Sequence, residues 1–417
     1  MISRTVRNST ANVVGEALWG FQSALVTPAT VLVILLNNHG ADERTTSLIS
    51  AIETGGLLLP QILGPFLFRS RSRLKQHMLI YHFIAVIPFL FAIAAAAAWP
   101  GSSQSATRIA ILGCFAAYII AIGAVVAAWN AWFAHLFDVS IRGTVSGIIW
   151  CAMAAGGALG GLVSGRIIHT WQDANPYPWL YGLAGIIAAL SIATYWVIDD
   201  PAAQEPDPPR LGARELLARC RRSFADGNFR AFILARILGN AGFCVAPLIA
   251  LHFLSAEAGS VSQDAVVTCG VGLTIGAAVS SLIFGRLGDR LGHRVGLASG
   301  FALLLVALSA LMLADGLIGC AIVYALMGLA TGCVAIASQN LQIETCPHDS
   351  RISHLIAGSL VIGIGGAIVP IIVGSVAAGF GRPVAFACCL AASAVALVWT
   401  LIALRDPRHP AVPASST

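Results

Sequence analysis

The sequence predicts an all-α membrane protein with twelve transmembrane helices. Of its 417 residues, 57% are hydrophobic and only 10% are charged, whereas a soluble protein carries roughly 25% charged residues. The hydrophobic residues form long runs, and a helix needs about 20 apolar residues to cross a bilayer. On this measure the helices are expected near residues 12–36, 46–68, 77–99, 107–134, 142–169, 178–198, 229–254, 263–285, 294–314, 317–343, 351–379 and 383–404.

One long connection divides these helices into two groups of six. It begins with four prolines between Pro201 and Pro209, which prevent a helix there. Residues 213–224 are rich in arginine and are expected to form a basic amphipathic helix lying on the membrane. The predicted organisation is an N-terminal six-helix half (1–198), a cytoplasmic linker (199–228) and a C-terminal six-helix half (229–417).

The two halves also share a pattern of residues. When the fifth and eleventh helices are aligned without gaps, Arg142 falls on Arg351 and Gly165 falls on Gly374. Such an internal repeat is typical of transport proteins built from two related halves. The sequence therefore predicts two pseudo-symmetric halves.

The basic residues predict the orientation. Only Lys75 is a lysine among 24 basic residues, and most of the arginines lie in the connections that are cytoplasmic if the N-terminus is inside. The outer ends carry only Arg44, Arg108, Arg166 and Arg382. Because cytoplasmic loops are enriched in positive charge, we expect a multi-pass protein of the cell inner membrane with both termini in the cytoplasm.

Composition argues against several other classes. The ten cysteines lie mostly within apolar runs and form no C-x-x-C pair, so we predict no disulfide framework, metal site or cofactor. The arginines lie in short loops, so their charge does not indicate a nucleic-acid partner. The phosphate-binding pattern G-x-x-x-x-G-K-[ST] does not occur, which argues against a nucleotide-driven pump.

A charged stretch between two apolar runs carries the strongest motif. Residues 285–294 read GRLGDRLGHR and are expected to form a tight turn at the membrane surface. The pattern resembles the cytoplasmic loop motif of the major facilitator superfamily, in its bacterial type. The resemblance implies the fold of that family over nearly the whole chain and a secondary transporter that works by alternating access. The matching positions are Gly285, Gly288, Asp289, Arg290, Gly292 and Arg294.

The resemblance also implies a cytoplasmic gate. Asp289 ends the eighth helix, where its charge faces the negative end of the helix dipole and needs a partner. In the family this aspartate meets the start of the fifth helix, which here carries Arg142. In the first half, residues 64–73 keep the glycine and the basic positions, but Phe68 replaces the aspartate. Whether that degenerate motif functions is left open.

The fifth helix contains a second glycine-rich stretch, at residues 156–165. It loosely resembles a motif of the family's drug/proton antiporters, although Gly161 stands where that motif has proline. Close packing of small residues between helices is the alternative interpretation. The stretch therefore does not predict antiport.

Charged residues inside the predicted spans are few, and each is a functional candidate. Glu16, Arg236 and Glu53 are the coupling candidates. Glu16 and Arg236 lie at matching places on the first and seventh helices and are expected to pair, either for coupling or as a structural ion pair. Glu53 is the second candidate for coupling, or an interfacial residue that reaches solvent. Glu344 is expected to be a capping charge at a loop.

The resemblance places the substrate on the first, fourth, seventh and tenth helices. Their faces are mostly apolar, with a few hydrogen-bonding groups, which suits an amphipathic organic molecule. Helix–helix packing is the alternative role for each residue. The cavity candidates are Trp19, Ser23, Tyr118, Trp129, Asn130, Asn240, Tyr324, Ser338 and Gln339.

Together these features predict a monomeric secondary active transporter of a small amphipathic molecule, coupled to protons. The alternative is a membrane protein of the same fold that does not transport, such as an assembly or pigment-delivery factor. An enzyme is not expected, since no paired catalytic residues fall on a defined face. Substrate and direction of transport do not follow from the sequence.

Overall fold

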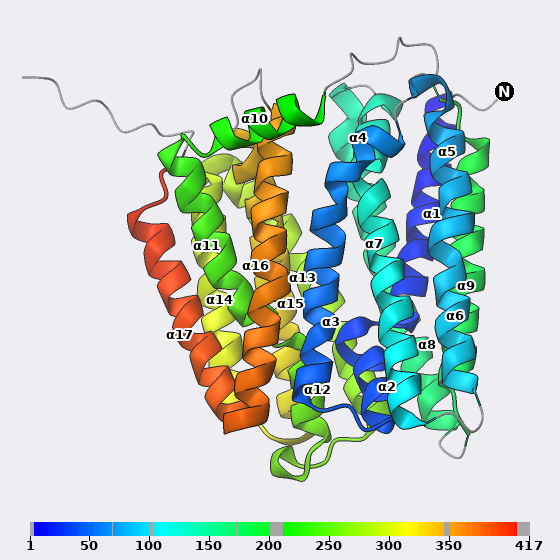
Figure 1. The fold of residues 1–417 in the computed structure, drawn as a ribbon, viewed down its shortest axis with the longest axis vertical. Coiled ribbons are helices and arrows are strands. Elements are labelled where there is room, and N and C mark those ends of the chain that lie inside the picture. The colour runs from blue at the N-terminus through cyan, green and yellow to red at the C-terminus, as the bar shows by residue number, and fades with distance from the viewer. Residues whose placement is uncertain are drawn as a thin grey trace, which may run out of the picture.

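The computed structural model describes residues 4–68, 70–99, 103–137, 139–171, 174–200, 212–345 and 351–406. Within these residues the chain is helical, with no strand, and it contains twelve helical segments long and apolar enough to cross a membrane. The prediction of twelve transmembrane helices is confirmed. Figure 1 shows them as a bundle of roughly parallel rods.

The N-terminal half contains α1 to α9. Its helices are α1 (Arg4–Leu25), α2 (Val33–Asn38), α3 (Glu43–Leu58), α4 (Gly64–Leu67), α5 (Leu74–Tyr81), α6 (Ile87–Ala98), α7 (Gln104–Leu136), α8 (Val139–Thr170) and α9 (Tyr177–Thr194). The C-terminal half contains α11 to α17. Its helices are α11 (Gly227–Phe243), α12 (Ala246–Leu254), α13 (Gln263–Leu291), α14 (His293–Leu313), α15 (Gly316–Glu344), α16 (Arg351–Phe380) and α17 (Arg382–Ile402). Between the halves lies α10 (Ala213–Ser223).

Several spans consist of more than one helix because prolines interrupt them. The first span breaks after α1 at Pro28, which begins a short π-helix, Pro28–Leu32, before α2. The second bends at Pro60, in a 3-10 turn at Leu59–Leu63. Proline lacks an N–H and clashes with the preceding turn, so it ends or bends a helix. The first span also begins earlier than predicted, at Arg4 rather than near residue 12.

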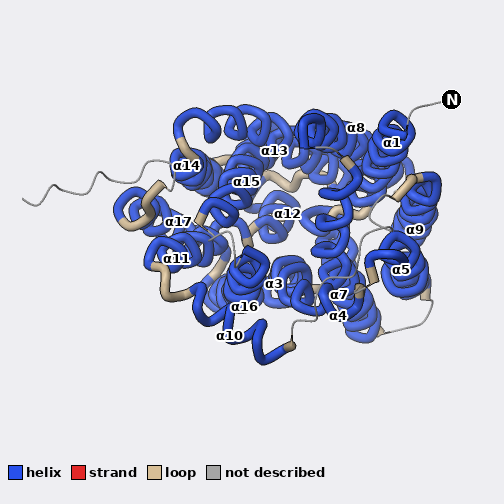
Figure 2. Tube along the Cα trace, turned by 90° about the horizontal axis from the view of Figure 1, so that it is seen from above, coloured by secondary structure: helices blue, strands red, loops and turns tan. Residues whose placement is uncertain are grey.

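The bundle has two distinct ends (Figure 1). We call the end at which α1 begins, α17 ends and α10 lies the α10 end, and the opposite end the far end. Figure 2, along the bundle axis, shows α1, α8 and α9 on one side and α11, α14 and α17 on the other. The halves meet along α8 with α13 and along α3 with α16.

Glycines allow α1 and α8 to pack backbone against backbone. A Cβ atom on Gly156 would lie 2.0 Å from the carbonyl oxygen of Ala17, and one on Gly160 would lie 2.2 Å from that of Phe21. On the facing helix, a Cβ on Gly20 would lie 2.1 Å from a backbone oxygen of α8. Gly156 and Gly160 are therefore required for packing within the half, as the small-residue interpretation predicted.

Side-chain caps fix the starts of helices at both ends of the bundle. The Asp42 carboxylate accepts hydrogen bonds from the Thr45 amide, at 2.9 Å, and from its hydroxyl, at 2.5 Å, so α3 begins at Glu43. The hydroxyl bond lowers the pKa of Asp42. At the other end, Asp226 caps α11 by accepting from the amide of Phe229 at 2.9 Å.

The outer surface of the bundle is apolar. Ile109, Leu313 and Ile318 are 72%, 85% and 76% exposed, and many other large aliphatic side chains are exposed around the perimeter. Such a surface is costly in water and favourable in lipid. With twelve spans, the chain is therefore a multi-pass membrane protein.

Candidate functional site

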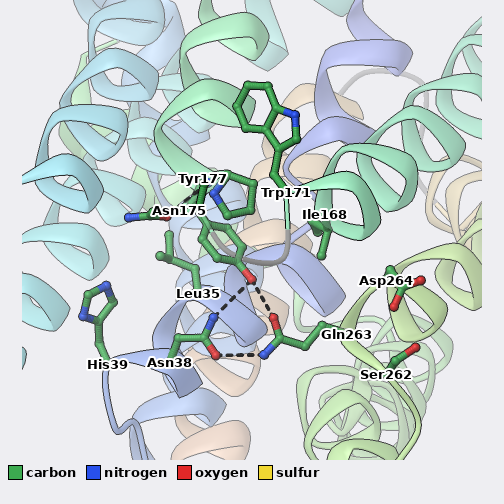
Figure 3. Close-up of a pocket in the computed structure, with 12 residues that line it drawn as sticks. Leu35, Asn38, His39, Ile168, Trp171, Asn175, Tyr177, Ser262, Gln263 and Asp264 are labelled. Carbon is green, nitrogen blue, oxygen red and sulfur yellow. Dashed lines mark hydrogen bonds between the residues drawn. The ribbon is translucent and has the colours of Figure 1, made fainter.

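At the far end, a triangle of hydrogen bonds joins the two halves. Tyr177, at the start of α9, donates its hydroxyl to the side-chain oxygen of Gln263, at 3.2 Å. Gln263 begins α13 and donates its amide to Asn38 at 3.0 Å, and Asn38 donates to the Tyr177 hydroxyl at 3.3 Å. The triangle lies beside a cavity of about 540 Å³ (Figure 3).

Two further side-chain pairs reinforce the same end. His169, near the end of α8, lies 2.9 Å from the carboxylate of Asp264 on α13. Arg382, at the start of α17, pairs with Glu43 at 3.1 Å and also donates to the carbonyl oxygen of Leu251 at 2.9 Å. We call the set the far-end latch. It comprises Asn38, Glu43, His169, Tyr177, Gln263, Asp264 and Arg382.

Farther from the far end than the latch, glycines bring the two halves into close contact. A Cβ on Gly165 of α8 would lie 2.5 Å from the Thr268 hydroxyl of α13. A Cβ on Gly161 would lie 2.7 Å from a methyl group of Val271. The glycine stretch therefore has two faces: Gly156 and Gly160 pack within the half, whereas Gly161 and Gly165 pack between halves.

Two further hydrogen bonds cross between the halves closer to the middle. Ser50 of α3 donates to the carbonyl oxygen of Cys244 at 3.1 Å, and Tyr324 of α15 donates to that of Ala29 at 3.5 Å. The half-to-half hydrogen bonds and ion pairs named so far lie between the far end and the middle of the bundle. In this conformation these bonds hold the halves together at the far end and in the middle.

The loop motif at the α10 end differs from the expected tight turn. The α-helix of α13 continues through most of the motif to Leu291, and the chain turns at Gly292, where φ is +89°. A side chain there would collide with Asp406, which accepts a hydrogen bond from the Arg294 amide at 3.3 Å. Arg294 also donates to the carbonyl oxygens of Thr400 and Leu401. The last arginine of the motif thus fastens α14 to the end of α17.

Asp289 is 72% exposed in this conformation, and its carboxylate lies 3.8 Å from the ring of His293. His293 is buried and also lies 3.6 Å from Glu344. Glu344 therefore faces a histidine within its own half, beyond the capping role expected for it. The side chain of Arg142 lies outside the described residues, so the predicted contact with Asp289 stays a prediction.

In the degenerate motif of the first half, aromatic packing replaces the charge. The ring of Phe68 makes an edge-to-face contact with Tyr81, with ring centres 5.3 Å apart. Phe68 therefore joins α4 to α5 within its own half, where the aspartate of the intact motif is a charged group.

Glu16 lies in an aromatic cluster of the N-terminal half. Its carboxylate accepts a hydrogen bond from the Tyr195 hydroxyl at 3.0 Å. The Tyr195 ring contacts Trp129 with centres 4.7 Å apart, and His82 contacts both Trp129, at 5.5 Å, and Trp19, at 6.0 Å. Two predicted cavity residues, Trp19 and Trp129, are thus brought together with Glu16.

The predicted ion pair between Glu16 and Arg236 is not formed in this conformation. The structure describes both residues, and Glu16 is bonded to Tyr195 within its own half. On α11, the Nε–H of Arg236 and the amide nitrogen of Asn240, one turn away, have no partner among the described residues. Arg236 and Asn240 are partly buried, so α11 presents two polar groups that nothing in the described part of the chain satisfies.

Glu53 lies on α3, close to the contact between the halves. It is partly buried, one turn after Ser50, and its neighbour Thr54 packs against Gly366 of α16. Its side chain therefore lies beside the contact between the halves, and its role in coupling stays a prediction.

The remaining cavity candidates divide into three groups. Ser23 and Tyr118 are linked through Gln22, whose amide donates to their oxygens at 2.8 and 3.4 Å. Tyr324 is buried with its hydroxyl on Ala29, and Ser338 is buried with no partner for its hydroxyl among the described residues. Asn130 and Gln339 are exposed.

Tyr195 and His82 were missed by sequence reasoning. Tyr195 was counted within the sixth span, and only the packing of α9 against α1 brings its hydroxyl to Glu16. A polar aromatic residue late in an apolar run was the available signal. His82 had an equally simple signal, as a histidine inside the third span, five residues after His77.

These features define a class: a polytopic α-helical membrane protein built from two halves that are bonded to each other at the far end and in the middle. The sequence profile of the Major Facilitator Superfamily matches residues 13–246 and 231–417. The chain belongs to this family, as the loop motif predicted. No curated protein sequence matches it.

Solved transporters share the fold. A POT family transporter in complex with 5-aminolevulinic acid superposes with a TM-score of 0.71 at 13% identity, covering 95% of each chain. A mutant form of the nucleoside transporter NupG gives 0.71 at 13% identity, covering 97% of this chain and 100% of that one. A D-xylose-proton symporter gives 0.69 at 14% identity, covering 98% and 100%.

Proposed function

We propose that this protein is a secondary active transporter that moves a small amphipathic organic molecule across a membrane by alternating access. The observation that carries the proposal is the asymmetric contact between the halves. The half-to-half bonds described above lie at the far end and the middle, so rocking about that contact would open and close the α10 end.

The charge pattern supports the α10 end as the cytoplasmic end. Arg4 and Arg7 lie there on α1, and Arg214, Arg221 and Arg222 lie there on α10. Since basic residues favour the cytoplasmic side, the conformation would be one in which the outer side is closed. We place the protein in the cell inner membrane on this basis.

The substrate would bind between α11 and the aromatic cluster of the first half. Arg236 and Asn240 offer unsatisfied donors, which suit an oxygen-bearing or anionic group of the substrate. Trp19 and Trp129 offer flat apolar surface for the rest of the molecule. This combination favours an amphipathic molecule over a polyphosphate, which would require more positive charge.

Coupling to protons would rest on Glu16. A carboxyl group among aromatic rings binds or releases a proton when its access to water or its hydrogen-bond partner changes. The hydrogen bond from Tyr195 would hold Glu16 in this conformation. Glu53, on the α3 face beside the other half, is the second candidate.

The test is flux into proteoliposomes against an imposed pH gradient. Candidate substrates are first identified as compounds that raise the melting temperature of the purified protein with concentration. We expect Glu16→Gln to abolish gradient-driven accumulation while substrate exchange continues, because exchange needs no net proton movement. The matched control is Glu257→Gln, an exposed glutamate at the far end.

Two results would count against the proposal. The first is that Glu16→Gln accumulates substrate as the wild type does, whereas Glu53→Gln does not accumulate it. That result would assign proton coupling to Glu53. The second is that folded wild-type protein binds a compound but carries no compound of a broad panel across the membrane. That result would favour a membrane protein of the same fold that does not transport.

A further inference from the structure

The helix α10 connects the two halves and has two different faces. Leu216, Cys220 and Ser223 are buried, and the helix packs against α16. The spacing of these residues, four and then three, places them on one side. The amphipathic helix predicted from the sequence is confirmed, with its apolar face turned to the protein.

The opposite face of α10 is basic and lines a surface depression of about 580 Å³. The lining residues are Arg214, Leu217, Ala218, Arg221 and Arg222. Arg219 lies outside this set and forms an ion pair with Glu215. Among the described residues, Arg214, Arg221 and Arg222 form no ion pair, so the depression carries three positive charges.

An exposed leucine lies among these arginines. Leu217 is 67% exposed, and the other residues that line the depression are Ala218 and the three arginines. Figures 1 and 2 place α10 across the α10 end of the bundle and at its perimeter, outside α16. A helix at that level and radius lies where the headgroups of a surrounding bilayer would lie.

We propose that this face of α10 binds the headgroup of an anionic phospholipid. The guanidinium groups of Arg214, Arg221 and Arg222 would bind the phosphate, since arginine forms paired hydrogen bonds with phosphate oxygens. Leu217 would enter the boundary between headgroups and acyl chains. Charge complementarity with an anionic leaflet and the exposed leucine both favour a lipid over a soluble anion.

The experiment is native mass spectrometry of the full-length protein in detergent, titrated with phosphatidylglycerol or phosphatidylcholine. The wild type is expected to bind its first phosphatidylglycerol at least tenfold more tightly than phosphatidylcholine. Each basic residue near an anionic lipid surface strengthens binding roughly fivefold. The variant Arg214→Gln/Arg221→Gln/Arg222→Gln is therefore expected to lose tenfold or more, and Leu217→Ser to lose affinity without any change of charge.

The matched control removes the same charge elsewhere. Arg44→Gln/Arg73→Gln/Arg166→Gln changes three exposed arginines away from α10 and is expected to bind as the wild type does. If the triple variant of α10 misfolds, the single variant Arg222→Gln, with an expected loss of roughly fivefold, takes its place.

Three results would overturn the proposal. The first is unchanged phosphatidylglycerol binding in the α10 variants, and the second is an equal loss in the control. The third is displacement of the lipid by inorganic phosphate at comparable concentration, which would identify a site for soluble anions. Because the readout is lipid binding, its failure would leave the transport proposal unaffected.

Discussion

Breaking the ion pair between Glu43 and Arg382 is expected to open the far end. Their atoms lie 3.1 Å apart, and their side chains are 25% and 21% exposed. At an effective dielectric constant of about 20, two charges at that distance attract by roughly 5 kcal/mol. Desolvation and side-chain entropy cancel most of this attraction. For an ion pair that is neither fully exposed nor fully buried, a net stabilisation of about 1–2 kcal/mol remains.

If the pair exists only while the far end is closed, that energy biases the conformational equilibrium. A loss of about 1–2 kcal/mol shifts the ratio of closed to open states by roughly five- to thirtyfold. Glu43→Gln and Arg382→Gln are expected to give similar shifts, and the double variant no more than either. Arg382→Lys keeps the charge but not the planar fork, so an intermediate effect is expected.

The shift can be measured as a distance distribution between two spin labels at the far end. Ala106 of α7 and Ala256, just beyond α12, are exposed and belong to different halves. Cysteines placed there, in a background without the native cysteines, report opening by pulsed electron paramagnetic resonance. Arg44→Gln and Glu257→Gln are the charge-matched controls. Unchanged distributions in both latch variants, or equal shifts in the controls, would refute the reasoning.

Three other changes test the α10 end, the helix packing and the orientation. Asp289→Asn should favour the conformation open at the α10 end, by about 1–3 kcal/mol if its partner is partly desolvated, and transport should fall while expression stays normal. Gly160→Ala should lower the melting temperature, since its Cβ would meet a carbonyl oxygen at 2.2 Å, whereas Gly182→Ala, with nothing within 4 Å, should not. For topology, a cysteine replacing Ser102 should react with an impermeant thiol reagent from outside cells, and a cysteine replacing Ala203 should react only from inside. Labelling of position 203 but not 102 from outside intact cells would show the opposite orientation.

The sequence predicted the spans well because hydropathy depends on local composition. The first helix was expected to begin near residue 12, and there a long-range contact decides: Asn8 bonds to the backbone of Asp199, at 2.9 and 3.0 Å, and lies within α1. The end of α13 differs for a local reason: helical hydrogen bonds continue through the glycines and charged residues as far as Gly292, so Leu291 lies inside the helix.

The candidate site was predicted less completely than the fold. Glu16 was found because a carboxylate in an apolar span is rare, but its partner was assigned from the alignment of two helices. That alignment indicates the level of each residue along the bundle axis, but it does not indicate the direction in which its side chain points. Tyr195, which binds Glu16 at 3.0 Å, lies 179 positions away in sequence, and no local pattern links the two.

The two halves share a backbone plan but differ in charge. The C-terminal motif keeps Asp289 as an exposed carboxylate near His293, whereas the N-terminal motif has Phe68 packed on Tyr81. A carboxylate can exchange one charged or hydrogen-bonded partner for another as the halves move, but a packed ring has only its apolar neighbours. A charge-dependent clamp at the α10 end would therefore depend on the C-terminal motif. Replacing Phe68 with aspartate would remove the ring contact with Tyr81 and would not place a partner for the new carboxylate beside it. For this reason Asp289→Asn is expected to lower the transport rate by more than Phe68→Asp could raise it.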